Sequence, residues 1–200
     1  MMEWSTTTTI LDDLRNHQNA AAWRRFAERF RTPIVRFCRN SGLSDADSED
    51  VAQEALAAFA DAFREGRYDR QRGRLSSWLF GIAYNQILRQ RQNAARQSAR
   101  RTEPGSSFWD NLPGDDAAQN AWNQEWEQAL IEQCLARVRQ EVEPATMRAF
   151  EAVVQHNRTP AQAAAELGIP VKVVYNAKYA VLKRIRALMS ELEEQDSHSG

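Results

Sequence analysis

The stretch TPAQAAAELGIPVKVVYNAKYAVLKRIRALM, from Thr159 to Met189, predicts two helices with a tight turn between them. Thr159 can cap a helix and Pro160 fits its first position, so we expect this helix to end just before Gly168. Pro170 then opens a second, longer helix. A short helix, a glycine turn and a second helix form the helix-turn-helix pattern.

The second of these helices carries every lysine of the chain, namely Lys172, Lys178 and Lys183, and all other basic residues are arginines. A compact cationic helix after a glycine turn suits the major groove of DNA, where phosphates attract charge and base edges are exposed. The segment is therefore predicted to bind duplex DNA.

The overall composition limits the class of protein and the number of domains. The chain has 200 residues, a hydrophobic fraction of 42% and a formal net charge of −1. This length allows one large domain or two small ones, and the hydrophobic fraction argues against a disordered chain. Because the charges are unevenly distributed, local fields matter more than the total.

The two cysteines and the start of the chain give further limits. Cys38 and Cys134 have no CxxC spacing and no nearby histidine, so we expect buried or unreactive thiols of a reducing compartment, with neither a disulfide framework nor a zinc site. The first residues lack a basic and then apolar leader, and no apolar run is long enough to span a membrane. These features predict a cytoplasmic protein.

A helix with an acidic exposed side is predicted from Ser44 onward. Its buried stripe recurs at three-four spacing from Val51 to Phe63. The polar side carries Asp47, Glu49, Asp50, Gln53 and Glu54. Helix capping and solubility would explain these residues, and so would a docking surface for a basic partner; the pattern alone leaves both open.

The segment that follows this helix is positively charged. Arginines are frequent from Arg64 to Arg74, where glycines indicate a loop, and no acidic residue occurs between Arg70 and Thr102. Leu75 to Leu88 resumes a helical pattern. Aromatic residues and an amide lie among the basic ones, in the set Arg74, Trp78, Phe80, Tyr84, Asn85, Arg89 and Arg91. Rings that stack on bases and arginines that hold phosphates suit single-stranded or melted nucleic acid, although at least one of Trp78 and Phe80 should be core.

An acidic segment separates the two halves of the chain. From Thr102 to Ala136 there is no lysine or arginine, and turn-forming residues predict that it begins as a linker, with a helix resuming near Ala121. Phe108, Trp109 and Leu112 are too apolar for a pure spacer, so we expect them to dock on a domain. No segment has a convincing strand pattern. The predicted fold is all-α, with two small helical domains joined by a flexible acidic linker.

Three segments in this order resemble the extracytoplasmic-function group of bacterial sigma factors. DSEDVAQE at 47–54 is similar to the acidic signature of region two, and YDRQRGRLSSWLFGIAYN at 68–85 is similar to the run that follows it. Arg137 to Met189 resembles region four and its helix-turn-helix. The resemblance implies an N-terminal extension over 1–19, region two over 20–98, a linker over 99–128, region four over 129–192 and a disordered tail over 193–200.

The resemblance also implies roles for individual residues. The acidic side would bind core RNA polymerase through Asp47, Glu49, Asp50, Gln53 and Glu54. Melted minus-ten DNA would be held by Arg74, Trp78, Tyr84, Asn85, Arg89 and Arg91. Double-stranded minus-thirty-five DNA would be contacted by Lys172, Tyr175, Asn176, Lys178, Tyr179 and Lys183. An anti-sigma factor is a further candidate partner, and neither a cofactor nor a catalytic residue is implied.

Three other classes of protein compete with this interpretation. A helix-turn-helix regulator that is not a sigma subunit would explain residues 159–189 but neither the acidic side nor the basic aromatic segment. An enzyme is disfavoured because the histidines are scattered, no glycine-rich phosphate loop occurs and no nucleophile is paired with a histidine. An RNA-binding adaptor would leave the linker and the second helical domain unexplained.

Overall fold

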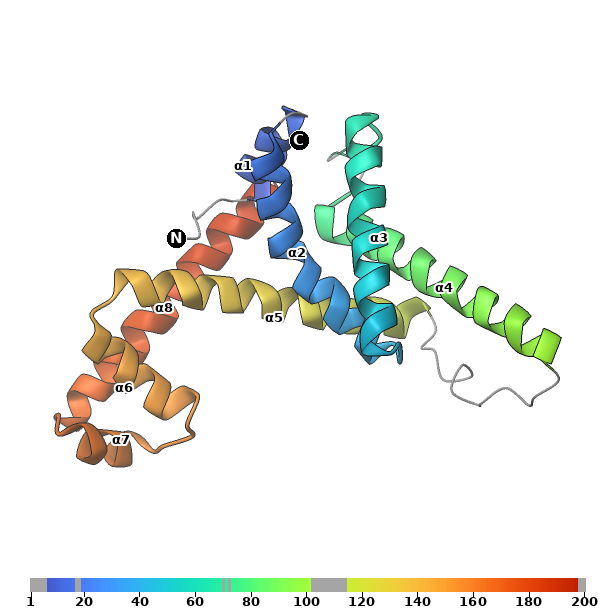
Figure 1. Cartoon of the computed structure of the whole chain (residues 1–200). Helices are drawn as coiled ribbons and strands as arrows, with labels where there is room; N and C mark the ends of the chain where they lie inside the picture. The colour runs from blue at the N-terminus through green and yellow to red at the C-terminus, as the bar shows by residue number, and fades with distance from the viewer. Residues whose placement is uncertain (1–6, 17–18, 70, 72, 102–114, 198–200) are drawn as a thin grey trace. The chain divides into compact units, whose positions relative to one another are not determined.

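The computed structural model describes residues 7–16, 19–69, 71, 73–101 and 115–197, with the backbone alone at 7–9, 94–101, 115 and 193–197. Eight helices form in these residues (Figure 1). They are α1 (Thr7–Arg15), α2 (Ala20–Asn40), α3 (Asp45–Arg64), α4 (Leu75–Arg101), α5 (Asp115–Glu141), α6 (Pro144–Val154), α7 (Pro160–Leu167) and α8 (Val171–Ser197). No strand occurs in the described part of the chain. The all-α prediction is confirmed.

The chain divides into two compact units. The N-terminal unit comprises Thr7–Ala129 and the C-terminal unit comprises Leu130–Ser197. The boundary falls within α5, so this one helix contributes its first part to one unit and its last part to the other.

Helix α2 is the centre of the N-terminal unit. Asn19 caps it by accepting a hydrogen bond from the backbone N–H of Ala22 at 3.0 Å. Most of its apolar stripe is buried, and Pro33 lies inside the helix without dividing it. Phe26 stacks on Phe59 of α3 with ring centroids 4.4 Å apart. Burial of each such side chain stabilises the fold by about 1.5–3 kcal/mol, so this stripe fixes how α2 and α3 pack.

The N-terminal extension contributes a helix to the same core. In α1, Ile10, Leu11 and Leu14 are buried in the cluster that contains the aromatic residues of α2. Asp13 of α1 also forms an ion pair with Arg25 of α2 at 2.8 Å. The N-terminal extension therefore contains a helix packed on α2.

The predicted linker over 99–128 differs from the structure. Helix α4 continues to Arg101, residues 102–114 with Phe108, Trp109 and Leu112 lie outside the described residues, and α5 begins at Asp115, six residues before Ala121. The structure shows an ordered helix for 115–128 in place of a flexible tether.

Two tryptophans explain this difference. Trp122 is fully buried and meets Phe37 edge-on, with centroids 5.4 Å apart. One helical turn later, Trp126 stacks on Phe30 at 5.2 Å. The acidic composition suggested a solvated spacer, but an apolar stripe at i, i+4 spacing gives a helix a face to bury. Residues 115–129 therefore complete the core of the N-terminal unit.

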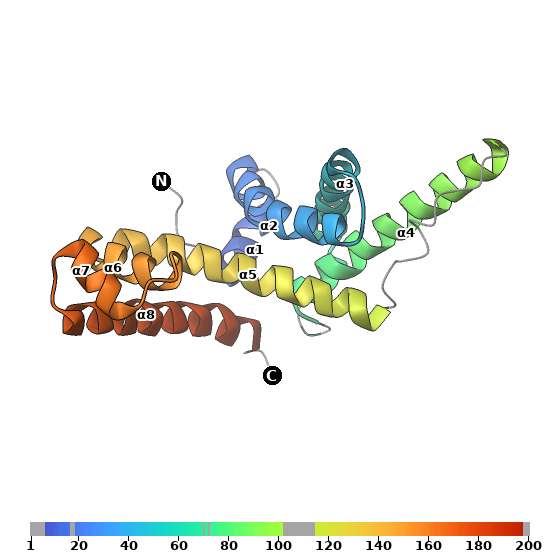
Figure 2. The same ribbon diagram turned by 90° about the horizontal axis from the view of Figure 1, so that it is seen from below.

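The C-terminal unit packs α6 and α7 against α8 (Figure 2). Its main core joins Met147 and Phe150 of α6 to Val181, Ile185 and Leu188 of α8. At the surface, Arg184 donates a hydrogen bond to Glu141 at 2.7 Å, which lowers the pKa of that carboxyl group. Helix α8 continues to Ser197, into the segment for which we predicted a disordered tail.

Both cysteines are buried and neither is in a disulfide, as the sequence predicted. Burial raises the pKa of the Cys38 thiol to about 12, so it stays protonated and unreactive at neutral pH.

The turn between α7 and α8 depends on Gly168, whose φ of 66° is left-handed. Nothing lies within 4 Å of an added Cβ at this position, so Gly168→Ala is strained only through its backbone. We expect a loss of about 1 kcal/mol in the stability of the C-terminal unit, measured by urea unfolding.

Gly81→Ala is the matched control, because Gly81 lies within α4, has no positive φ and is also open to an added Cβ. In a helix, alanine is favoured over glycine by up to ~1 kcal/mol, so this change should stabilise the protein slightly. Equal shifts of the same sign for both substitutions would contradict the role of Gly168.

Candidate nucleic-acid interface

The acidic side of α3 separates into two groups. Asp50, Gln53 and Glu54 are exposed. The side chains of Asp47 and Glu49 are half-buried and engage partners within the N-terminal unit. Only the first group is fully presented on the surface.

Local structure accounts for the second group. Ser44 caps α3, accepting a hydrogen bond from the backbone N–H of Asp47 at 3.1 Å and donating one to its carboxylate at 2.6 Å. Gln90 of α4 donates to the same carboxylate at 3.3 Å. Glu49 forms an ion pair with Arg31 of α2. Two of the five predicted docking residues therefore also hold helices of this unit together.

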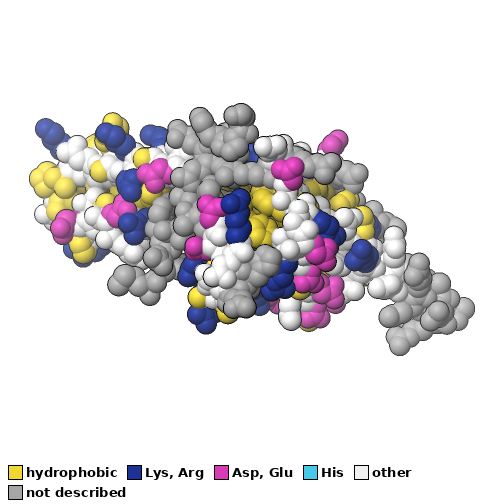
Figure 3. All heavy atoms as spheres, turned by 90° about the horizontal axis from the view of Figure 1, so that it is seen from above, with side chains coloured by type: hydrophobic (Ala, Val, Ile, Leu, Met, Phe, Trp, Pro, Cys, Tyr) yellow, Lys and Arg dark blue, Asp and Glu magenta, His cyan; other side chains and the backbone are white. Residues whose placement is uncertain are grey.

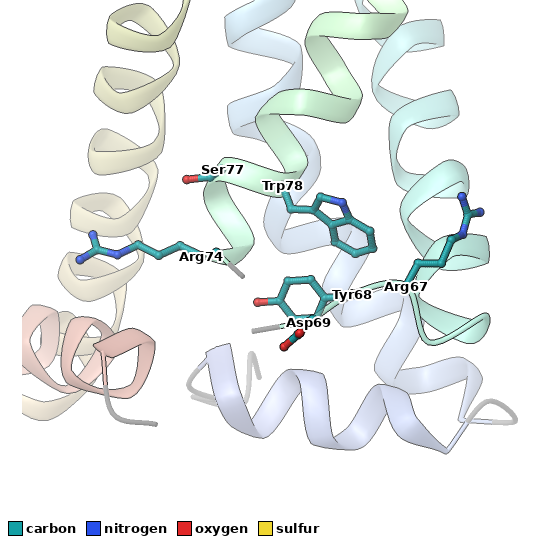
Figure 4. Close-up of a pocket in the computed structure, with 7 residues that line it drawn as sticks. Arg67, Tyr68, Asp69, Arg74, Ser77 and Trp78 are labelled. Atoms are coloured by element: carbon teal, nitrogen blue, oxygen red, sulfur yellow. The ribbon is translucent and has the colours of Figure 1, made fainter. Parts of the chain in front are cut away.

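A pocket of about 340 Å³ opens where the loop after α3 meets the first turn of α4 (Figure 4). Tyr68 and Trp78 form one wall by stacking with ring centroids 4.9 Å apart. Trp78 is backed by Phe59 at 5.2 Å and Tyr68 by Phe63 at 6.1 Å. The remaining lining residues are Arg67, Asp69, Gly73, Arg74 and Ser77.

Charge flanks this aromatic wall. In Figure 4, Arg67 and Arg74 extend on opposite sides of the Tyr68–Trp78 pair. Arg67 is tied to Glu65 by an ion pair at 2.7 Å, and Arg74 is exposed. Aromatic faces bordered by arginines suit a nucleobase with its phosphates. Our prediction included Trp78 and Arg74 but missed Tyr68, although this aromatic residue lies in the run 68–85 that carries the family likeness.

The other predicted minus-ten residues lie on two sides of α4. Helical spacing puts Asn85 and Arg89 seven and eleven residues after Trp78, on the same side of the helix, and both are exposed. Tyr84 instead stacks on Phe80 at 5.4 Å, which in turn meets Trp122 at 6.0 Å. Arg91, seven residues after Tyr84, shares that side.

Trp78 of the pocket therefore shares one side of α4 with Asn85 and Arg89, which lie further along the helix and do not line the pocket. Tyr84 and Arg91 lie on the side of α4 that faces α5. Tyr84 is next to Asn85 in the sequence, but the two side chains lie on different sides of the helix. Further arginines of the basic segment occur at positions 70 and 72 and within 94–101. Their side chains lie outside the part of the chain that the structure describes.

In the C-terminal unit, all six predicted duplex-DNA contacts lie on α8, and α7 precedes it across the glycine turn. The helix α7 begins with a capping box, in which Thr159 and Gln162 each satisfy the other's backbone N–H. Its left-handed end at Gly168 then reverses the chain into α8. The buried stripe of α8 includes Val174, Val181 and Ile185.

Five of the six predicted contacts lie opposite that stripe. Lys172, Tyr175, Asn176, Tyr179 and Lys183 are exposed, with Tyr175 at 58% and Tyr179 at 65% of their full surface. Lys178 follows the buried Ala177 and is half-buried at the edge of the core. The structure therefore does not group Lys178 with the other five residues.

Charges of both signs alternate on the surface, as Figure 3 shows for one face. None of the helices in the described ranges is long and apolar enough to cross a bilayer. Within the same ranges, no group of three or more metal-ligating side chains occurs.

Residues 26–97 match the family model described as Sigma-70 region 2. The matched segment runs from α2 through α3 into α4, so it contains both the acidic side of α3 and the aromatic pocket. Comparison with curated proteins gives no match. This segment, 72 of the 200 residues, is therefore similar to region 2 of the sigma-70 family.

Proposed function

We propose that this chain is an extracytoplasmic-function type of sigma factor, which binds core RNA polymerase and directs promoter recognition, DNA melting and initiation. The observation that supports it best is the pairing, within the segment matched to region 2, of an exposed acidic surface with a basic aromatic pocket. A regulator that only binds an operator needs neither.

Docking on the polymerase is assigned to Asp50, Gln53 and Glu54, with Asp47 and Glu49 at the edge of the surface. The first three are exposed on neighbouring positions of α3. A carboxylate pair with an amide between them can accept several hydrogen bonds from a basic partner, because charge-assisted bonds to arginine are stronger than neutral ones.

Capture of the melted minus-ten strand is assigned to the pocket and the adjoining side of α4. An unstacked base would lie against the Tyr68–Trp78 wall, and Asn85 would hydrogen-bond to a base edge. Arg74 and Arg89 would hold phosphates. Tyr84 and Arg91, which are also assigned to minus-ten DNA, would act from the opposite side of α4. Extruding a base costs a few kcal/mol, which stacking of about 1–3 kcal/mol per base and the phosphate contacts must offset.

Helices α7 and α8 are proposed as the helix-turn-helix of region four, which reads duplex minus-thirty-five DNA. The support is the capped α7, the left-handed glycine and the exposed polar and aromatic stripe of α8. This assignment places both DNA contacts in one cytoplasmic protein, and an anti-sigma factor remains a candidate partner.

Transcription by purified components tests the proposal. The chain should co-purify with core RNA polymerase, and the complex should start transcripts at defined genomic promoters that core enzyme alone does not use. Co-purification without any initiation, or DNA binding without polymerase, would overturn the sigma assignment and favour a conventional regulator.

Replacement of Asn85 separates DNA melting from polymerase binding. The side chain is exposed, so Asn85→Ala should leave the fold and polymerase affinity unchanged. Loss of a base contact worth about 1–3 kcal/mol should reduce open-complex formation roughly 5- to 100-fold, measured by permanganate reactivity of unpaired thymines.

Gln92→Ala is the matched control, since Gln92 is an exposed amide two turns further along α4. It should have little effect on either measurement. An equal loss of polymerase binding and open-complex formation in Asn85→Ala would contradict the assigned role.

A further inference from the structure

The exposed side of α8 carries its residue types in a definite order. Lys172, Asn176, Tyr179 and Lys183 are separated by four, three and four residues, which is the spacing of one continuous helical stripe. All four are exposed. The two cations lie at the ends of the stripe, and the amide and the phenol lie between them.

The length of this stripe matches the dimensions of DNA. At 1.5 Å per residue, the two lysines are about 17 Å apart along the helix axis. The major groove is roughly 12 Å wide, so lysines at the two ends can reach phosphates on opposite walls of the groove. The residues between them then face the base edges.

Of those middle residues, Asn176 is the one with a specific base partner. Its amide presents one donor and one acceptor side by side, which match the N7 acceptor and N6 amino group of adenine in the major groove. Lysine contacts to phosphate carry no sequence information. Tyr175 and Tyr179 are exposed near Asn176 on α8 and offer rings to neighbouring bases.

The buried stripe fixes this orientation. Val174, Ala177 and Val181 lie on the opposite side of α8 and are buried within the C-terminal unit. Asn176 cannot rotate inward without exposing them. The amide is therefore held outward by packing that does not involve the DNA contact itself.

We propose that Asn176 is the base-reading residue of the C-terminal unit and selects an adenine in duplex DNA, while Lys172 and Lys183 supply sequence-independent phosphate contacts. This rests on the duplex-DNA binding proposed for α7 and α8. It adds to that binding a preference for one base, and it assigns base recognition and phosphate contacts to different residues of the stripe.

Selection from random duplexes tests the base preference directly. The full-length chain should enrich a motif with an adenine at one fixed position. Asn176→Ala should still bind but lose the preference at that position alone, with a fall of roughly 5- to 100-fold in affinity for the enriched duplex. Asn176→Gln, which keeps the amide, should recover part of the preference.

Two controls separate reading from general affinity. Lys183→Gln should weaken binding to all duplexes similarly and reduce the dependence on salt concentration, without changing the motif. In the enriched duplex, 7-deazaadenine at the fixed position should reduce binding by the wild-type chain and leave Asn176→Ala unaffected, because only the N7 acceptor is removed.

A motif that is unchanged in Asn176→Ala, an enriched motif without a fixed adenine, or the absence of any motif would each overturn the proposal. The proposed sigma function is decided separately, by co-purification with core polymerase and by transcription. Normal initiation with an unchanged motif would reject the role of Asn176 alone.

Discussion

Asp50→Arg is expected to abolish association with core RNA polymerase. Asp50 is exposed at the centre of the acidic surface, next to Gln53 and Glu54, so reversal of its charge should not disturb the fold. Opposite a basic partner, like charges cost several kcal/mol, which corresponds to a loss of on the order of 100-fold or more in affinity. Fluorescence anisotropy with labelled protein and purified core enzyme would measure it.

Glu127→Arg provides a control with the same change of net charge. Glu127 is exposed on α5, outside the acidic surface of α3. Its replacement should reduce polymerase affinity much less. Asp50→Arg should also keep the affinity of the full-length chain for duplex DNA, because α8 is untouched. Full polymerase affinity after reversal at Asp50 would show that this side of α3 is not the docking surface.

Trp122→Ala is expected to cause the largest loss of stability. The indole is fully buried between Phe37 of α2 and Phe80 of α4. Truncation of a buried tryptophan removes its transfer free energy and leaves a cavity, so we expect a loss of about 3–5 kcal/mol. Urea unfolding followed by helical circular dichroism would measure the change, with the transition of the N-terminal unit shifted.

Gln124→Ala lies two residues away on the same helix, and its side chain is exposed. Its effect on stability should stay within about 0.5 kcal/mol. If residues 115–128 were a flexible tether, Trp122→Ala would be as mild as Gln124→Ala. Equal behaviour of the two variants would therefore contradict the packing of α5 on the N-terminal unit.

Helix ends and the buried and exposed sides of a helix can be predicted from the sequence. The helix boundaries around Thr159 and Gly168 were predictable because capping and left-handed glycine depend on a few neighbouring residues. The buried and exposed sides of α3 followed from three-four periodicity for the same reason. Local chemistry determined these features.

The linker illustrates what composition could not predict. Acidic residues and turn signals before Trp122 suggested a solvated spacer. No neighbouring residue in the sequence indicated what the tryptophans pack against. Their partners, Phe30, Phe37 and Phe80, lie at least forty positions earlier in the chain. A contact over that separation has no local signal, so only folding decided that residues 115–129 belong to a core.

The site residues divide in the same way. Residue types and helical period were enough to predict an all-helical protein, an acidic side on α3, a basic aromatic segment and a polar stripe on α8. The tertiary structure alone separated Asp50 from the paired Glu49, added Tyr68 to the pocket wall and turned Tyr84 toward α5. It also placed Lys178 at the edge of the core. Which side a residue finally presents depends on the helices packed against it, and those contacts are made between distant parts of the chain.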